Sequence, residues 1–200
     1  MNNLPALERG YITFGCLNNP RKFTDRTLIM WASVLHAVDS SRLLLLALDG
    51  KTPVRLRDRM EKVRIPMDRV EFVPFKPRDS YLRTYHEIDI GLDSFPYNGH
   101  TTTLDSLWMG VPVVSRVGNT AVGRSGFSLL SNLGLRDLIA FTDEDFVHVA
   151  SRLCSDLRGL ARLRQAMRDS IESSTLMDGA SFASHMEAVY REIWSRWCRR

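Results

Sequence analysis

Short apolar runs alternate with segments of helical periodicity along most of this chain. The run RLLLLAL at residues 42–48 shows no polar alternation, as expected for a strand that is covered on both faces. Strands that alternate with helices favour a parallel sheet with helices on both faces. The sequence therefore predicts an α/β fold with a doubly wound, Rossmann-like parallel sheet. The predicted strands cover residues 11–17, 42–48, 69–75, 88–93, 111–115 and 138–141, and the helices between them cover 25–38, 53–63, 78–86, 103–109 and about 122–133.

The remainder of the chain is predicted to be helical. Thr142 and Asp145 fit a capping box for a helix that ends near Cys154. The C-terminal helices as a group are placed at about 142–198. The other two members of this group are predicted near 156–173 and 181–197.

Length and composition fit one lobe with a core of normal size. Residues 1–10 look like a linker or leader that enters the first strand, and residues 11–200 form the lobe. The net charge of +4 is compatible with an anionic ligand. The basic runs RLRDRMEKVR and RLRQAMR are interleaved with apolar positions, which is typical of solvated helix faces. Nucleic acid is therefore not an expected partner.

Cysteine spacing and hydropathy indicate the cellular compartment of the protein. The chain has three cysteines, Cys16, Cys154 and Cys198, and no CxxC pattern, which argues against a disulfide framework or a zinc site. Its longest strongly apolar run, LLLLAL, is too short to span a membrane, and the N-terminus lacks the pattern of a signal peptide. These features predict a cytoplasmic protein with no metal site and no membrane span.

The segment FPYNGHTTTLDSLWMGVPVVS carries a glycine, a histidine and three threonines where a helix is predicted to begin. Gly99 allows a tight turn, and the N–H groups and dipole at the start of the helix favour an anion such as a phosphate. His100, Thr101 and Thr102 can add further hydrogen-bond donors. This segment is therefore a candidate phosphate site.

Asp105 lies about one turn further along, where a carboxylate could accept both hydroxyls of a ribose. The alternative is structural, because the pattern T-x-x-D at residues 102–105 matches a capping box. Neither the G-x-G-x-x-G pattern nor a loop ending in G-K-[ST] is present, so a dehydrogenase or NTPase has little support.

A second candidate is NNPRKFTD, residues 18–25, directly after the first predicted strand. Lys22 could place a cation against a diphosphate, and Asn19 could add an amide donor. The alternative is a solvated lysine in a loop where Thr24 or Asp25 merely caps the next helix.

A third candidate is PFKPRDSY, residues 74–81, after the third predicted strand. A turn here could offer backbone groups to the edge of a base, with Arg78 or Tyr81 stacking on it. The alternative is an ordinary proline turn before a capped helix. All three segments fall at the carboxyl edge of one sheet, so they can converge on one ligand.

Three blocks of the sequence carry a family resemblance: GYITFGCLNNPRKFTDRTLIMWASVL, DIGLDSFPYNGHTTTLDSLWMGVPVVS and MEAVYREIWSRWC. From about residue 5 to 198, the chain resembles the carboxyl-terminal catalytic lobe of the O-GlcNAc transferase family, especially its bacterial members. The resemblance implies the UDP-sugar-binding lobe of a GT-B-type glycosyltransferase, with UDP-GlcNAc as donor and protein Ser or Thr hydroxyls as acceptors. It also implies catalysis without a metal or other cofactor.

The resemblance assigns roles residue by residue. Lys22 would neutralise the diphosphate and stabilise UDP as it leaves. The remaining UDP contacts fall on Asn19 at the phosphate side, on the turn of Lys76, Pro77 and Arg78 with Tyr81 at the uracil, on His100, Thr101 and Thr102 at the diphosphate, and on Asp105 at the ribose.

Members of that family carry a first catalytic lobe, and often tetratricopeptide repeats, before this region. The chain alone would then be a donor-binding half-enzyme. An apolar stripe near Trp194 and Trp197 packs either against that first lobe or on the chain's own sheet. Two other functions stay open: a non-catalytic UDP-sugar-binding module, and a GT-B-type transferase with a different donor or a glycan acceptor.

Overall fold

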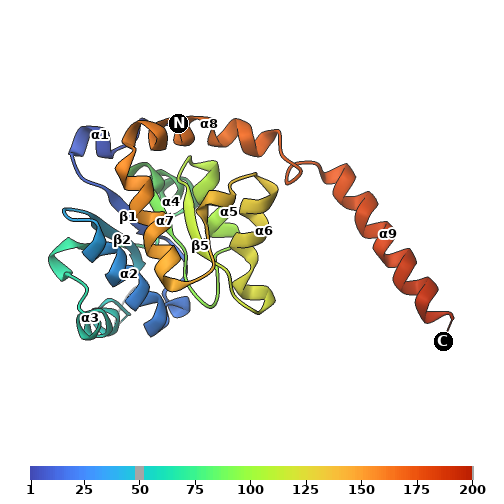
Figure 1. Ribbon diagram of the computed structural model, residues 1–200, viewed down its shortest axis with the longest axis horizontal. Helices are drawn as coiled ribbons and strands as arrows, with labels where there is room; N and C mark the ends of the chain where they lie inside the picture. Colours follow the sequence, from blue (N-terminus) through green and yellow to red (C-terminus); the bar gives the residue numbers. More distant parts are fainter. Residues whose placement is uncertain (48–51, 200) are drawn as a thin grey trace.

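A six-stranded parallel sheet organises the molecule (Figure 1). The computed structural model describes residues 1–47 and 52–199. The strand order β3-β2-β1-β4-β5-β6 is that of a doubly wound nucleotide-binding sheet, so the predicted fold class is confirmed. The strands are β1 (Thr13–Cys16), β2 (Arg42–Ala47), β3 (Val70–Pro74), β4 (Ile90–Leu92), β5 (Val113–Arg116) and β6 (Ile139–Ala140).

The helices follow the predicted order with small shifts in their ends. Leu48, the last residue of the second predicted strand, lies outside the described residues. The predicted helix 103–109 begins two residues earlier, directly after His100. The helices are α1 (Ala6–Arg9), α2 (Asp25–Ala37), α3 (Thr52–Lys62), α4 (Arg78–Thr84), α5 (Thr101–Trp108), α6 (Ser125–Asn132), α7 (Asp143–Ser155), α8 (Leu157–Glu172) and α9 (Gly179–Trp197).

The uniform apolarity of β2 has the predicted cause. Leu43 and Leu45 face a core built with α2, α3 and α7, whereas Leu44 and Leu46 face a second core built with residues beside α4 and α5. Alternate residues of a strand point to opposite faces, so both faces of β2 are covered. A third cluster joins β5 and β6 to α5, α6 and α8.

The strands are shorter than the apolar runs that predicted them. Leu17 and Ile88 are buried although they lie outside β1 and β4. These residues pack in the turns next to the strands, and burial rather than ladder pairing explains their apolar character. A run of apolar residues therefore marks the buried segment and overestimates the strand.

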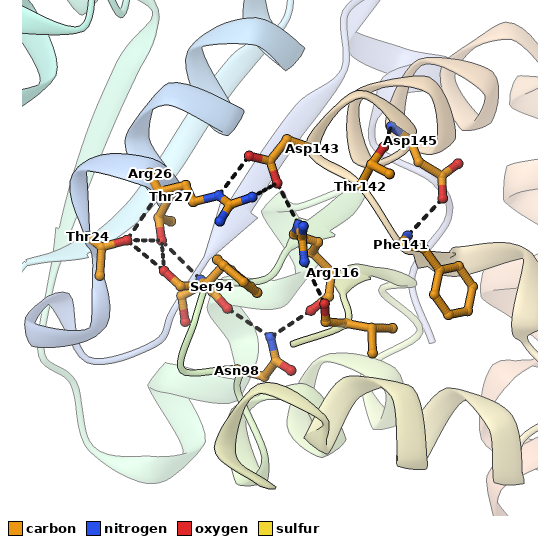
Figure 2. A network of polar contacts seen from close by, with 12 residues as sticks. Thr24, Arg26, Thr27, Ser94, Asn98, Arg116, Phe141, Thr142, Asp143 and Asp145 are labelled. Carbon is orange, nitrogen blue, oxygen red and sulfur yellow. Dashed lines mark hydrogen bonds and ion pairs between the residues drawn. The ribbon is translucent and has the colours of Figure 1, made fainter. Parts of the chain in front are cut away.

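The Thr142 cap predicted for α7 is present, but the reciprocal bond of a capping box is displaced by one residue (Figure 2). The Thr142 hydroxyl oxygen accepts from the Asp145 N–H at 3.0 Å, and the Asp145 carboxylate accepts from the Phe141 N–H at 2.9 Å. Side chains thus satisfy N–H groups at the start of this helix that have no partner within it.

The first ten residues pack on the lobe. Leu4 and Ala6 are buried in the main core, and residues 6–9 form the short helix α1, which the sequence did not predict. The Asp89 carboxylate accepts from the Ala6 and Thr13 N–H groups at 2.9 and 2.8 Å. The role of residues 1–10 as a linker within a longer protein stays a prediction.

Helix α9 extends away from the rest of the fold (Figure 1). None of its residues is buried, and Trp194 and Trp197 are 67% and 68% exposed. The alternative in which this stripe packs on the chain's own sheet is therefore wrong. The other exposed apolar residues of α9 are Phe182, Val189, Tyr190 and Ile193. Within residues 1–47 and 52–199, no helix combines the length and apolarity needed to cross a membrane.

We expect deletion of residues 179–200 to leave the free energy of unfolding of the lobe within about 0.5 kcal/mol of wild type, because no side chain of α9 is buried. Urea denaturation measures this. Met167→Ala in α8 is the contrasting variant, since this residue is 1% exposed and its truncation should cost about 2–5 kcal/mol. A large loss on deletion would contradict the position of α9.

Candidate functional site

The three candidate segments meet at the carboxyl edge of the sheet. Lys22, after β1, donates to the Asn98 carbonyl, after β4, at 3.0 Å. Arg78, after β3, pairs with Asp105 in α5. Residues from all three segments line one hollow of about 390 Å³: Leu17, Asn19, Leu46, Phe75, Lys76, Arg78, Tyr81, Thr102 and Asp105. The structure thus brings the candidate residues together as the sheet topology requires.

The hollow has apolar walls and a polar rim. Leu17, Leu46, Phe75 and Tyr81 supply the apolar surface, and Phe75 is exposed. The Tyr81 hydroxyl lies 2.8 Å from the Tyr85 hydroxyl. Burial raises the pKa of Tyr81 to about 12, so its hydroxyl stays protonated at neutral pH. A flat, largely apolar ligand with hydrogen-bonding edges fits this surface.

Asp105 does not cap its own helix, so the capping-box alternative for residues 102–105 is wrong. Both carboxylate oxygens instead accept from Arg78, at 2.6 and 2.7 Å. The Asp105 side chain is 10% exposed and that of Arg78 is 59% exposed. An ionised carboxylate has about four acceptor positions. Two of them therefore remain for a ligand hydroxyl pair, or all four if the exposed arginine swings away.

Lys22 is not the solvated lysine of the alternative interpretation. Its ammonium group lies 4.1 Å from the centroid of the Tyr97 ring, besides its bond to the Asn98 carbonyl. Partial burial lowers the pKa of Lys22, while the nearby Asp93 opposes this shift. In the described part of the chain Lys22 forms no ion pair, so its charge is available to an anion.

Asn19 has a local role in the structure. Its side-chain oxygen accepts from the Arg21 N–H at 3.0 Å and caps the single turn Pro20–Lys22. Thr24 caps α2, as the alternative interpretation of this loop proposed. The two caps fix the turn that carries Lys22, so capping and ligand binding are compatible here.

The start of α5 points its first turn at the same edge. His100 and Thr101 are exposed, and intrahelical bonding begins with the Leu104 N–H donating to the His100 carbonyl at 3.0 Å. The earlier N–H groups have no partner within the helix. A Cβ at Gly99 would lie 2.5 Å from Thr103 Oγ1, so the close approach at this turn requires glycine. A helix start of this kind can bind an anion.

The loop before α5 is fixed from three elements (Figure 2). The Phe95 carbonyl accepts from the Thr24 and Thr27 hydroxyls of the α2 side at 2.6 and 2.5 Å. The guanidinium groups of Arg26 and Arg116 lie over the Phe95 ring at 4.9 and 4.5 Å, and both donate to Asp143 at the start of α7. The loop conformation is therefore set before any ligand binds.

Two polar residues missed by sequence reasoning join the candidate phosphate segments. Asp93 is buried at the end of β4, and its carboxylate accepts from the Gly99 N–H at 2.7 Å and the Ser115 hydroxyl at 2.6 Å. Asn18 donates to Asp93 and accepts from the Thr102 hydroxyl. The available signal was position: Asp93 directly follows β4, and Asn18 lies two residues after β1.

Burial raises the pKa of the Asp93 carboxyl from 3.8 to about 6. The folded state then holds a proton between pH 4 and 6 that the unfolded chain releases, so the stability from Asp93 is full below about pH 4 and is lost as the pH rises to about 6. We expect the ionisation of Asp93 to lower the free energy of unfolding by about 2–3 kcal/mol between pH 4 and pH 6. Urea denaturation against pH should show a flatter profile for Asp93→Asn; an unchanged profile would contradict the assignment.

Comparison with known proteins identifies the family. The family model described as Glycosyl transferase family 41 matches residues 3–186. The chain belongs to glycosyl transferase family 41. The match spans the sheet, α7, α8 and the beginning of α9, and the resemblance found in the sequence is confirmed.

Relatives of this family-41 chain come from plants, animals and bacteria. A probable UDP-N-acetylglucosamine–peptide N-acetylglucosaminyltransferase SPINDLY of Petunia hybrida is 40% identical over 198 residues, 97% of this chain and 21% of that protein. A UDP-N-acetylglucosamine–peptide N-acetylglucosaminyltransferase of Caenorhabditis elegans is 31% identical over 186 residues, 93% of this chain and 16% of that protein.

A solved structure of a Thermobaculum terrenum O-GlcNAc transferase variant superposes with a TM-score of 0.85 at 39% identity, covering 92% of this chain and 36% of that one. The family-41 chain therefore has the fold of a GT-B-type glycosyltransferase lobe, as predicted. It spans about a fifth of the length of the plant relative and about a third of the bacterial chain.

Proposed function

We propose that this chain is the UDP-GlcNAc-binding lobe of a glycosyltransferase that moves GlcNAc to Ser or Thr hydroxyls of proteins. The observation that carries the proposal is the meeting, at one sheet edge, of an apolar hollow, a carboxylate, a lysine and a helix N-terminus. The names of the family-41 relatives supply the sugar and the peptide acceptor.

The donor would follow the order of the groups along the edge. Uracil would enter the hollow beside Phe75 and Tyr81, with the Lys76–Pro77 backbone at its edge. The ribose would donate to Asp105, displacing or sharing Arg78. The diphosphate would lie at the start of α5, where His100, Thr101 and Thr102 offer donors.

Lys22 would act on the leaving group. As the bond between the sugar and the diphosphate breaks, negative charge develops on the phosphate oxygens of UDP. Positive groups already held in place lower the cost of that charge. Lys22, bound by the Asn98 carbonyl and the Tyr97 ring, and the N–H groups of α5 would supply this stabilisation without a metal.

The acceptor side would come from the rest of a longer protein. We propose that an upstream catalytic lobe supplies the acceptor site and the base, and covers the apolar face of α9. Support comes from the exposure of that face and from the short share of each relative that the chain spans.

We further propose a cytoplasmic location, in keeping with the free cysteines Cys16, Cys154 and Cys198.

The fluorescence of Trp194 and Trp197 tests the partner proposal. Both rings are exposed in this chain, so their emission should lie at long wavelength and be quenched by iodide. In the longer natural protein we expect blue-shifted emission and protection from iodide. Equal quenching in the two proteins would exclude burial of α9 by an upstream lobe.

Donor competition and turnover test the function. We expect UDP-GlcNAc to displace UDP from this chain, and GDP-linked sugars to fail. The longer natural protein should transfer labelled GlcNAc to a Ser- or Thr-containing peptide in the presence of EDTA. Displacement by a GDP-linked sugar would indicate a different donor, and binding without any transfer by the longer protein would indicate a non-catalytic module.

A further inference from the structure

We infer that Asp93, acting with Asn18, is a positioning residue for the diphosphate-binding loop, so that the preference of this chain for UDP over uridine depends on Asp93. The inference rests on the proposed function, because it assumes that UDP occupies the edge of the sheet. Neither residue lines the hollow that would take the nucleoside. Asn18 contacts Thr102 at the rim of this hollow, so we expect the effect to fall mainly on the diphosphate.

The Asp93 carboxylate collects donors from both sides of the loop. One oxygen accepts from the Gly99 N–H at 2.7 Å, the Ser94 N–H at 2.8 Å and the Asn18 amide at 3.2 Å. The other oxygen accepts from the Ser115 hydroxyl in β5 at 2.6 Å. Asp93 is 2% exposed, so water cannot replace these bonds at low cost. The carboxylate thus fixes both ends of the loop that leads from β4 to α5.

Asn18 extends this control to the other candidate phosphate segment. Its amide group donates to Asp93 and to the Ser94 hydroxyl, and its oxygen accepts from the Thr102 hydroxyl. A Cβ at Gly99 would lie 2.8 Å from the same Asn18 oxygen, so loop and asparagine are in close contact. The bond from the Thr102 hydroxyl to Asn18 therefore joins the first turn of α5 to the segment after β1.

Charge adds to the geometry. The Asp93 carboxylate lies near Lys22 and raises the pKa of that lysine against the effect of burial. Asp93→Asn removes the charge but keeps a carbonyl oxygen for the N–H groups of Ser94 and Gly99. Asp93→Ala removes both the charge and the acceptor. Comparing the two variants separates loop geometry from charge.

Asp89 offers a matched control at the opposite end of β4. Its carboxylate is also buried and also accepts two backbone N–H groups, those of Ala6 and Thr13. These bonds hold the N-terminal segment and lie away from the loop before α5. Asp89→Asn therefore perturbs a comparable buried carboxylate and should leave the ratio of UDP to uridine affinity unchanged.

The experiment is calorimetric titration of UDP and of uridine into the wild-type chain and the three variants. We expect Asp93→Ala to weaken UDP on the order of 10-fold, about the effect of one hydrogen bond to a charged group, with uridine unchanged. Asp93→Asn should retain most of the UDP affinity. Equal weakening of UDP and uridine binding, or an unchanged ratio of the two affinities in a folded Asp93→Ala, would overturn this inference and leave the proposed function standing.

Two further measurements keep the test decisive. If Asp93→Ala does not fold, Asn18→Ala takes its place, with the same expected drop in the UDP-to-uridine ratio. Hydrogen exchange of the Gly99 amide needs no ligand. It should be faster in Asp93→Ala or Asn18→Ala than in wild type, and unchanged exchange would contradict a positioning role for Asp93. Failure of wild type to bind UDP at all would instead remove the proposed function, and this inference with it.

Discussion

Lys22→Met is expected to slow sugar transfer by the longer natural protein on the order of 100-fold or more. The ammonium group is held 3.0 Å from the Asn98 carbonyl and over the Tyr97 ring, beside the start of α5. Methionine keeps the unbranched stem and removes the charge that would meet the departing diphosphate. Because charge develops as the bond breaks, the effect on rate should exceed the effect on UDP affinity.

Single-turnover transfer and calorimetric titration of UDP measure the two effects. Arg21→Met is the matched control, since this cation lies in the same turn and is exposed. It should change neither quantity by more than about twofold if only Lys22 reaches the diphosphate. Similar losses in both variants would mean that the loop contributes general positive charge and that Lys22 has no special place.

Arg164→Met is expected to cost about 1–3 kcal/mol of stability, the second large effect, because it removes hydrogen bonds to buried acceptors. Arg164 is fully buried in α8 and donates to the Ile88 carbonyl at 2.9 Å, the Tyr85 carbonyl at 3.3 Å and the Asn2 side chain at 2.6 Å. Burial lowers the pKa of Arg164 to about 10, so the group is still charged at neutral pH. Removing it leaves several buried acceptors without a donor.

Urea denaturation of Arg164→Met and Arg162→Met tests this account. Arg162 lies on the same helix but is 75% exposed, and its ion pair with Asp156 is long, at 3.9 Å. Arg162→Met should therefore lower the free energy of unfolding by no more than about 0.5 kcal/mol. A loss below 1 kcal/mol for Arg164→Met would contradict its role.

Sequence periodicity was enough for the order of elements, because burial of each face imposes a local pattern. The apolar run of β2, with Leu43 to Leu46 alternating between two cores, is the clearest case. The Thr142 cap of α7 was equally local and was confirmed, whereas the Asp145 carboxylate binds the Phe141 N–H rather than that of Thr142. Local pattern also gave the correct neighbourhood of the candidate site, because parallel strands end at one edge.

Contacts between distant residues could not be predicted in the same way. Arg78 and Asp105 are separated by 27 positions, and their pairing replaces the cap that T-x-x-D suggested. Asn18 and Asp93 are 75 positions apart, and each looks like an ordinary residue at the end of a strand. The position of α9 also lacked a local signal, since an amphipathic stripe predicts burial but not the surface that buries it.

The most direct test of the central claim is a calorimetric titration of UDP into this chain in EDTA, alongside Lys22→Met and His100→Ala. The account predicts that UDP binds without a metal and that both substitutions weaken it, because both residues lie where the diphosphate would sit. A folded wild-type chain that does not bind UDP, or that binds it only with an added divalent cation, would contradict the account.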